Sequence, residues 1–325
     1  MADANLQVAL VGAGRIAGAF AAPGDAPITH AAAINALPGV TLAAICDPAT
    51  EARAAFAQRW RVPVQVASIA ELDVSFDIIV VAVPDDLHVK TAIQILHKVP
   101  PRLLLMEKPL CVSQDELAPL AAALAANSKC NLAVNSSRRF DAGHSAVRAL
   151  LALEELGPLV DIRWVYYGGW LHNGVHVIDT LRMLLDDTLD CHWARLGYPG
   201  AAGDPCIEAE FRPRKNPDVR VLIESFPEDA FQLFEAEIRC RDGRVRLLDF
   251  GDEILVDRVW VNNKMERELK ITTPLPHDNS TPSMLAFYQS ATRYLREGDN
   301  GLIEKAGFAT AAETMRILFE TRKRV

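Results

Sequence analysis

Nearly continuous apolar runs recur along the first part of the chain, separated by amphipathic stretches. Strands that are buried on both faces have this continuous pattern. We predict strands over residues 6–11, 40–46, 76–83, 102–106 and 131–135, with helices over 29–37, 87–99 and 113–127 between them. This alternation predicts a doubly wound α/β domain with a parallel sheet, which binds ligands at the carboxyl ends of its strands.

The pattern changes after about residue 140. Helices over 143–155 and 174–185 flank a strand over 160–168, and from Asp190 onward short strand-like runs dominate. These runs cover residues 206–211, 219–226, 234–240, 244–250 and 254–261. Their spacing, with hairpin signals such as Asp242-Gly243, predicts an open and predominantly antiparallel sheet. Helices are expected again over 282–296 and 304–321.

The first strand leads into a glycine-rich turn. Residues 12–17 read Gly-Ala-Gly-Arg-Ile-Ala, the G-x-G-x-x-A pattern that joins a strand to a helix in dinucleotide-binding sheets. Gly12 permits the tight turn, Gly14 lets a pyrophosphate approach the backbone, and free N–H groups at the helix start favour phosphate. We therefore predict a dinucleotide site that includes Gly12, Gly14, Arg15 and Ile16. The alternative is a glycine-rich turn that binds no ligand.

Asp47 ends the second predicted strand. A carboxylate there accepts both hydroxyls of an adenosine ribose and repels a 2′-phosphate, and Arg53 is expected to lie one helical turn too deep to offset it. The expected cofactor is therefore NAD rather than NADP. The crossover before Asp47 is longer than the ~20 residues usual for this fold. Pro23 and Pro27 interrupt its helix, and Thr29 is placed to cap a second one.

Length and composition limit the possible classes of protein. The 325 residues suggest two domains, which we place at 1–135 (an NAD(P)-binding Rossmann domain) and 136–325 (an α+β domain for substrate binding and oligomerisation). The net charge of −8 argues against nucleic acid as a partner. No apolar stretch reaches the ~18 residues of a membrane span. Asp3 and the lack of a cationic leader, with six scattered cysteines, lead us to expect a cytoplasmic protein without a metal site.

Two further motifs follow predicted strands. Pro84 ends the strand over 76–83, and His88 is expected to cap or pack under the nicotinamide ribose, so both are counted as cofactor-binding. Glu107, also counted so, and Lys108 follow the strand over 102–106, which brings Lys108 out at the ligand-binding edge. A lysine there can hydrogen-bond a substrate hydroxyl. The alternative is a surface lysine in a turn; the Lys108-Pro109 bond can also be cis.

A third motif covers residues 168–179 and combines a glycine pair with two histidines. Asn173 is placed to cap the following helix. His172, His176 and Asp179 are spaced by four and three residues, so we expect them on one helical face or near it. A histidine at a helix start can shuttle protons. The two histidines also have the spacing of a metal pair, but the glutamate of H-E-x-x-H is absent.

Taken in order, these motifs resemble the glucose–fructose oxidoreductase / inositol dehydrogenase / MocA (Gfo/Idh/MocA) family. The matching segments are GAGRIA at 12–17, CDP at 46–48, VPDDLH at 83–88, EKPL at 107–110, NSSRRFD at 135–141 and GxHxxD at 174–179. The resemblance implies a two-domain NAD(P)-dependent oxidoreductase acting on sugars, cyclitols, nucleotide sugars or related alcohols. It also implies that Lys108 and His176 are the catalytic pair, and that the second sheet serves oligomerisation.

One position departs from that family. Most members carry an aspartate four residues before the active-site histidine, where this chain has His172. An anionic partner would stabilise the cation of His176, whereas a second imidazole disfavours it. The usual proton relay is therefore in question, and we include His172 among the catalytic candidates.

The sequence thus predicts hydride transfer between a substrate CH–OH group and the nicotinamide. His176 would be the general acid/base, and Lys108 would polarise the substrate oxygen. The expected substrate-binding residues are Arg138, Arg139, Asn173 and Asp179; the two arginines could equally be ordinary surface charges. The alternatives are an NAD-dependent redox-cycling glycoside hydrolase or lyase, and a non-catalytic dinucleotide-binding protein.

An oligomer is expected from the second sheet. Helices on one face leave the other face to be covered, and the alternating runs over 219–226 and 234–239 would supply that face. We therefore expect a homodimer or homotetramer.

Overall fold

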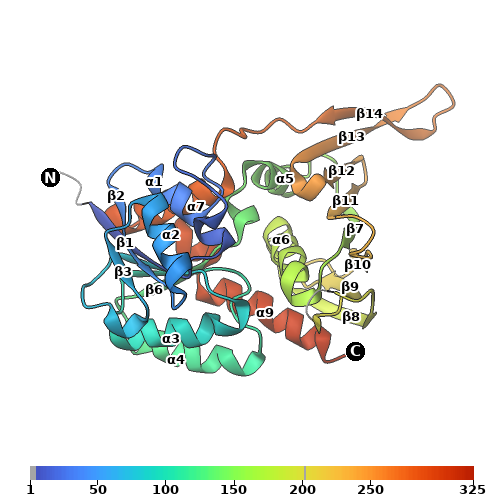
Figure 1. The fold of residues 1–325 in the computed structure, drawn as a ribbon. Helices are drawn as coiled ribbons and strands as arrows, with labels where there is room; N and C mark the ends of the chain where they lie inside the picture. The colour runs from blue at the N-terminus through green and yellow to red at the C-terminus, as the bar shows by residue number, and fades with distance from the viewer. Residues whose placement is uncertain (1–4, 201–202) are drawn as a thin grey trace. The chain divides into compact units, whose positions relative to one another are not determined.

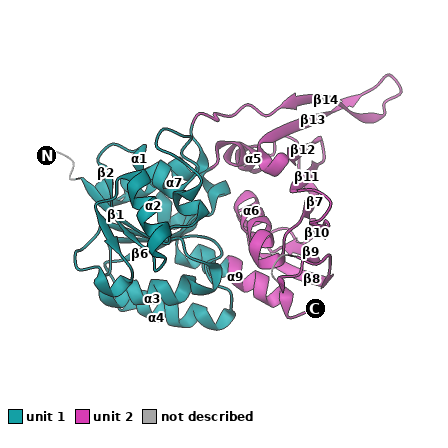
Figure 2. Ribbon diagram, viewed as in Figure 1, with its two compact units in different colours: residues 1–140, 281–313 teal, residues 141–280, 314–325 magenta. Residues whose placement is uncertain are grey.

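The computed structural model describes residues 5–200 and 203–325 (Figure 1). Asp3 lies outside the described residues. The chain divides into two compact units, which Figure 2 colours separately: unit 1 holds residues 1–140 and 281–313, and unit 2 holds 141–280 and 314–325. The sequence predicts contiguous domains that meet at 135/136. The units are instead discontinuous, since residues 281–313 return to unit 1.

Unit 1 contains a six-stranded parallel sheet in the order β3-β2-β1-β4-β5-β6. The strands are β1 (Leu6–Val11), β2 (Val40–Cys46), β3 (Val64–Val66), β4 (Ile78–Val81), β5 (Leu103–Met106) and β6 (Asn131–Val134). All their carboxyl ends lie at one edge, and the order reverses between β1 and β4, where such sheets bind ligands. The predicted doubly wound sheet is confirmed.

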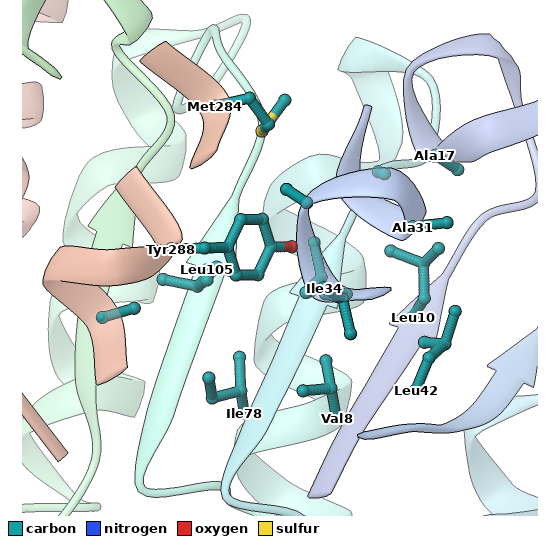
Figure 3. Close-up of a cluster of buried hydrophobic side chains, with 14 of the residues drawn as sticks. Val8, Leu10, Ala17, Ala31, Ile34, Leu42, Ile78, Leu105, Met284 and Tyr288 are labelled. Atoms are coloured by element: carbon teal, nitrogen blue, oxygen red, sulfur yellow. The ribbon is translucent and has the colours of Figure 1, made fainter. Parts of the chain in front are cut away.

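Helices supply the rest of unit 1: α1 (His30–Asn35), α2 (Thr50–Trp60), α3 (His88–Lys98), α4 (Leu117–Ala125), α7 (Ser283–Glu297) and α8 (Gly301–Ala306). The Thr29 side chain accepts a hydrogen bond from the Ala32 N–H, which confirms the predicted cap. In the core, Val8 and Leu10 of β1 meet Ile34 of α1 and Tyr288 of α7 (Figure 3). The late segment is therefore part of the first core.

Unit 2 contains an eight-stranded sheet in the order β14-β13-β12-β11-β7-β10-β9-β8. The strands are β7 (Leu159–Tyr166), β8 (Leu189–Leu196), β9 (Ile207–Pro213), β10 (Arg220–Ser225), β11 (Glu235–Cys240), β12 (Gly243–Leu248), β13 (Glu253–Val261) and β14 (Arg267–Pro274). Neighbours pair antiparallel except β7 with β10, so the predicted mostly antiparallel sheet is confirmed. The helices α5 (Ala142–Ala152), α6 (Val175–Leu185) and the end of α9 (Phe308–Arg322) complete the unit.

The two faces of this sheet differ in polarity. Val221 and Ile223 of β10 are fully buried, as is Ile238 of β11. Alternate residues on the other face are charged and paired across strands, including Arg163 with Glu224, Arg239 with Asp161, and both Arg244 and Arg246 with Asp257. The predicted runs therefore bury their apolar residues and turn mainly charged residues outward.

Candidate active site

The glycine turn after β1 has the shape that a dinucleotide requires. Gly12 has a φ of +101°, and a Cβ there would lie 2.3 Å from the carbonyl oxygen of Ala82, so only glycine fits. Gly14 is exposed, and a Cβ there would meet no atom within 4 Å. Open space at Gly14 leaves its backbone accessible to a diphosphate. The residues present therefore fit a dinucleotide.

The helix after this turn is short, as expected of a crossover that Pro23 and Pro27 interrupt. Arg15–Ala19 form one helical turn that ends at Gly18, where the φ of +146° is not helical. The indole of Trp60 donates a 3.2 Å hydrogen bond to the Gly18 carbonyl. Arg15 is exposed and lies 5.6 Å from the centre of the Phe20 ring. Any phosphate here would therefore be bound by individual N–H groups rather than by a long helix dipole.

Asp47 follows β2 and is anchored beside the glycine turn. One carboxylate oxygen accepts a 2.8 Å bond from the Ala13 N–H, and the other accepts one of the same length from the Ala49 N–H. Arg53 of α2 donates to the backbone oxygen of Asp47. The guanidinium of Arg53 is therefore engaged with the peptide of Asp47.

His88 links two loops at the carboxyl edge of the sheet. Its side chain is buried, with Nδ1 2.7 Å from the Pro109 carbonyl oxygen and Nε2 3.0 Å from the Val83 carbonyl oxygen. Val83 and Pro84 follow β4, and Pro109 follows β5. The observed role of His88 is thus to join the loop that carries Pro84 to the loop that carries Lys108.

Lys108 is half-buried directly after β5, and the Lys108-Pro109 bond is cis. Burial lowers the pKa of its ammonium and the charge of Arg138 lowers it further, although Glu107 and Asp85 oppose the shift. A lysine with a lowered pKa transfers a proton more readily near neutral pH. Lys108 therefore has the electrostatic setting of a reactive lysine rather than of a surface residue.

Glu107, predicted to bind the cofactor, makes its side-chain hydrogen bonds inside unit 1. Its side chain is buried and hydrogen-bonded to His30 and Asn135. Sequence reasoning missed His30 and Asn135 as site residues. Arg139 is also buried, whereas Arg138 is half-buried and lies near enough to Lys108 to affect its pKa.

In unit 2, the segment Trp170–Gly174 forms a turn before α6. Asp204 accepts hydrogen bonds from the Leu171 N–H (2.7 Å) and the His172 N–H (3.0 Å). Asn173 donates 2.9 Å to the Tyr167 carbonyl oxygen. The prediction that Asn173 caps the helix is therefore wrong: α6 has no side-chain cap, and Asp204 holds the preceding turn.

The three polar residues of the last motif lie in different environments. His172 is exposed, His176 is half-buried on α6, and Asp179 is buried. Asp179 accepts a 3.1 Å hydrogen bond from the hydroxyl of Thr314, which also accepts one from Arg182. His172 lies in the helical turn Trp170–Gly174, which runs directly into α6, whereas His176 and Asp179 belong to α6 itself. The observed contact of Asp179 is with α9.

Residues 5–200 and 203–325 hold no group of three or more His, Cys, Asp or Glu residues that could bind a metal ion. All six cysteines are free thiols, and burial raises the pKa of Cys111 to about 12, as expected of an inert thiol. None of the helices in these ranges has the length and apolar character needed to cross a bilayer.

Comparison with known proteins agrees with this geometry. Residues 6–136 match the model of the oxidoreductase family with an NAD-binding Rossmann fold, GFO_IDH_MocA. A curated protein from Amycolatopsis mediterranei (strain S699), provisionally named UDP-kanosamine synthase oxidoreductase subunit, is 32% identical over 166 residues. That alignment covers 45% of this chain and 44% of the relative, so the chain matches less than half of the relative's length.

Solved structures share the fold over the whole chain. The WlbA dehydrogenase from Bordetella pertussis, in complex with NADH and UDP-GlcNAcA, has a TM-score of 0.76 at 17% identity, covering 98% of this chain and 96% of that chain. The super-repressor mutant of Gal80p from Saccharomyces cerevisiae has a TM-score of 0.79 at 15% identity, covering 99% and 96%. Such low identities show the fold alone. Over residues 6–136 the sequence matches the Gfo/Idh/MocA family of oxidoreductases, in the part that forms its NAD-binding Rossmann fold.

Proposed function

We propose that this protein is an oxidoreductase that transfers a hydride between a nicotinamide cofactor and a CH–OH group of a sugar-like substrate. The observation that carries the proposal lies within unit 1. Gly12 and Gly14 follow β1 and Lys108 follows β5, so the dinucleotide turn and a lysine of lowered pKa share one edge of a parallel sheet. Ligands bind at this edge in doubly wound sheets.

The protein's own residues would bind the substrate oxygen and move its proton. Bound nicotinamide supplies the hydride acceptor or donor. Lys108 would donate a hydrogen bond to the oxygen of the reacting carbon, and its positive charge would stabilise the alkoxide character that develops there. His176 would accept or return the hydroxyl proton, with His172 as a second proton carrier. Arg138 would hold an anionic group of the substrate.

A nucleotide sugar is the substrate class that we favour. The Amycolatopsis relative carries the name of a UDP-kanosamine synthase subunit, and the WlbA dehydrogenase was solved with UDP-GlcNAcA. We propose NAD as the preferred cofactor, because the carboxylate of Asp47 lies at the end of β2 where it would repel a 2′-phosphate. The Asp47 side chain is fixed by two backbone N–H groups, so it is already held in place.

The test compares Lys108→Ala and His176→Asn with the wild-type enzyme. A positioned proton donor contributes about 10²–10⁴-fold to the rate, so each substitution should lower kcat by ~10² or more. The Kd for NADH should hardly change, because neither residue is placed to bind the adenosine half. A Lys108→Ala enzyme with near-normal turnover would refute the assignment. Glycoside cleavage without accumulation of reduced nicotinamide would instead indicate redox cycling.

A further inference from the structure

A chain of buried polar side chains lies next to Lys108 in unit 1. His30 (α1) and Tyr288 (α7) have no exposed surface, and Glu107 and Asn135 are also buried. Glu107 Oε1 lies 2.9 Å from His30 Nε2 and 2.7 Å from Asn135 Nδ2. His30 Nδ1 lies 2.8 Å from the hydroxyl oxygen of Tyr288. Four separate elements of one unit thus contribute to a single hydrogen-bonded network.

The directions of these hydrogen bonds follow from what each group can donate. The amide nitrogen of Asn135 only donates, so Glu107 Oε1 is the acceptor. A proton on His30 Nε2 gives Glu107 a second donor, and a neutral ring then accepts at Nδ1 from the hydroxyl of Tyr288. Burial, aided by the charge of Glu107, raises the pKa of Tyr288 well above its usual value, so the hydroxyl keeps its proton.

This arrangement leaves one negative charge in the interior, on Glu107. Burial opposes its ionisation, but the hydrogen bonds from His30 and Asn135, together with the charge of Lys108, outweigh burial and lower the pKa of Glu107. A buried charged group seldom makes a protein more stable than apolar residues of similar volume would at the same place. Stability alone therefore does not account for this network. The neighbours are in fact apolar, as Ile34, Leu105 and Met284 show beside Tyr288 (Figure 3).

We infer that His30 and Tyr288 are positioning residues that act through Glu107 to fix Lys108 at the sheet edge and to keep its ammonium charged. This inference rests on the proposed function, in which Lys108 donates to the substrate oxygen. Glu107 is covalently adjacent to Lys108, so anchoring its side chain restrains the peptide that carries the lysine. The network also holds an anion beside a cation that burial would otherwise disfavour.

The charged groups near Lys108 in unit 1 determine in which direction its pKa changes when one of them is removed. Glu107 and Asp85 raise its pKa, whereas burial and Arg138 lower it. Of the two anions, Glu107 has the larger effect. Removing its charge should therefore lower the pKa of Lys108 further. An opposite charge nearby favours the charged form of a lysine, so the loss of this anion should move the titration of Lys108 to lower pH.

Competitive acetylation with acetic anhydride tests this in the cofactor-free protein. The reactivity of each lysine is followed against pH by mass spectrometry, which yields the titration midpoint of Lys108 without any substrate. Glu107→Gln should lower that midpoint, because it removes the anion with the larger effect on Lys108. Tyr288→Phe should lower the Lys108 midpoint by less, because this variant keeps the Glu107 charge and removes only the hydrogen bond between Tyr288 and His30. The exposed Lys90 and Lys129 should titrate identically in all variants and serve as internal standards.

Tyr294→Phe is the matched control. Tyr294 is also on α7, and its hydroxyl accepts a 2.5 Å hydrogen bond from Asn131 at the start of β6, the opposite end of that strand from Asn135. Like Tyr288→Phe, Tyr294→Phe removes a tyrosine hydroxyl from α7, but this hydroxyl is not part of the network around Glu107. The titration midpoint of Lys108 should therefore not move.

An unchanged Lys108 midpoint in folded Glu107→Gln overturns the inference. If the Lys108 midpoint shifts in Glu107→Gln but not in Tyr288→Phe, Tyr288 has no part in positioning Lys108. If the midpoint shifts equally in Tyr288→Phe and Tyr294→Phe, the effect is a general one of altering α7, which overturns the role of Tyr288. If Glu107→Gln does not fold, the Tyr288→Phe and Tyr294→Phe pair decides alone. Absence of turnover in the wild type would refute the proposed function without altering these midpoints, so the two failures are distinguishable.

Discussion

Replacing Gly14 with alanine should separate cofactor binding from folding. Gly14 has a φ of −76° and a ψ of −171°, which any residue adopts, and a Cβ there meets no atom within 4 Å. Alanine at a compatible position stabilises by about 0.4–1 kcal/mol through the unfolded chain. Alanine is also a poorer first residue of a helical turn than glycine, which offsets part of that gain. The free energy of unfolding should therefore change by no more than about 0.5 kcal/mol.

The same methyl group should weaken dinucleotide binding strongly. It would occupy the open space through which a diphosphate approaches the backbone. Loss of one hydrogen bond to a charged group costs about 1.5–3 kcal/mol, which corresponds to a ~10- to 150-fold rise in Kd. The assay is titration with NADH, followed by energy transfer from tryptophan, beside urea unfolding of the cofactor-free protein.

Gly12→Ala provides the contrast, because its Cβ would lie 2.3 Å from the Ala82 carbonyl oxygen at a φ of +101°. That variant should lose stability as well as affinity. If Gly14→Ala binds NADH as tightly as the wild type, the dinucleotide does not bind where we place it.

Four other expectations can be measured independently. Asp47→Ala should narrow the ratio of Kd values for NADPH and NADH, and tighter binding of NADPH than NADH by the wild type would contradict the NAD assignment. His172→Asp should move the acidic limb of the pH dependence of kcat/KM to higher pH, because a nearby anion favours the cation of His176; superimposable profiles would leave His172 as a packing residue. Asp257→Asn should destabilise the fold by about 2 kcal/mol at pH 7, because hydrogen bonds from Thr272, Arg244 and Arg246 outweigh burial and lower the pKa of Asp257 from 3.8 to about 2. That contribution is present above pH ~4 and is lost as the pH falls toward 2, whereas Asp190→Asn, in an exposed pair with Arg214, should cost under ~1 kcal/mol. Light scattering at micromolar concentration should give a multiple of the 35.6 kDa monomer mass, and the monomer mass itself would contradict an oligomer.

Local patterns were sufficient to predict the buried strands and the glycine turn. Strands such as β4 are continuous apolar runs. The turn at Gly12 requires glycine, because its φ is positive and a Cβ would clash with the Ala82 carbonyl oxygen. Weaker patterns were missed. The edge strand β3 has only three residues, α2 buries only Phe56, Ala57 and Trp60, and β14 is rich in charged residues.

Contacts between distant segments could not be read from the sequence. His30 and Tyr288 are 258 residues apart and meet only because α7 returns to unit 1. Asp204 holds the turn before α6 from another loop, so Asn173 looked like the best local cap. Periodicity describes one element at a time, whereas these contacts depend on how elements pack.

Hydride transfer itself is the most direct test of the central claim. The wild-type protein is incubated with NAD and a panel of nucleotide sugars, cyclitols and free aldoses, and with NADH and the corresponding ketones, while the absorbance of reduced nicotinamide is recorded. We predict that at least one nucleotide sugar produces or consumes reduced nicotinamide in stoichiometric amounts, and that Lys108→Ala lowers this rate by ~10² or more. No change in absorbance with any member of the panel, from protein shown to bind NADH, would contradict the account.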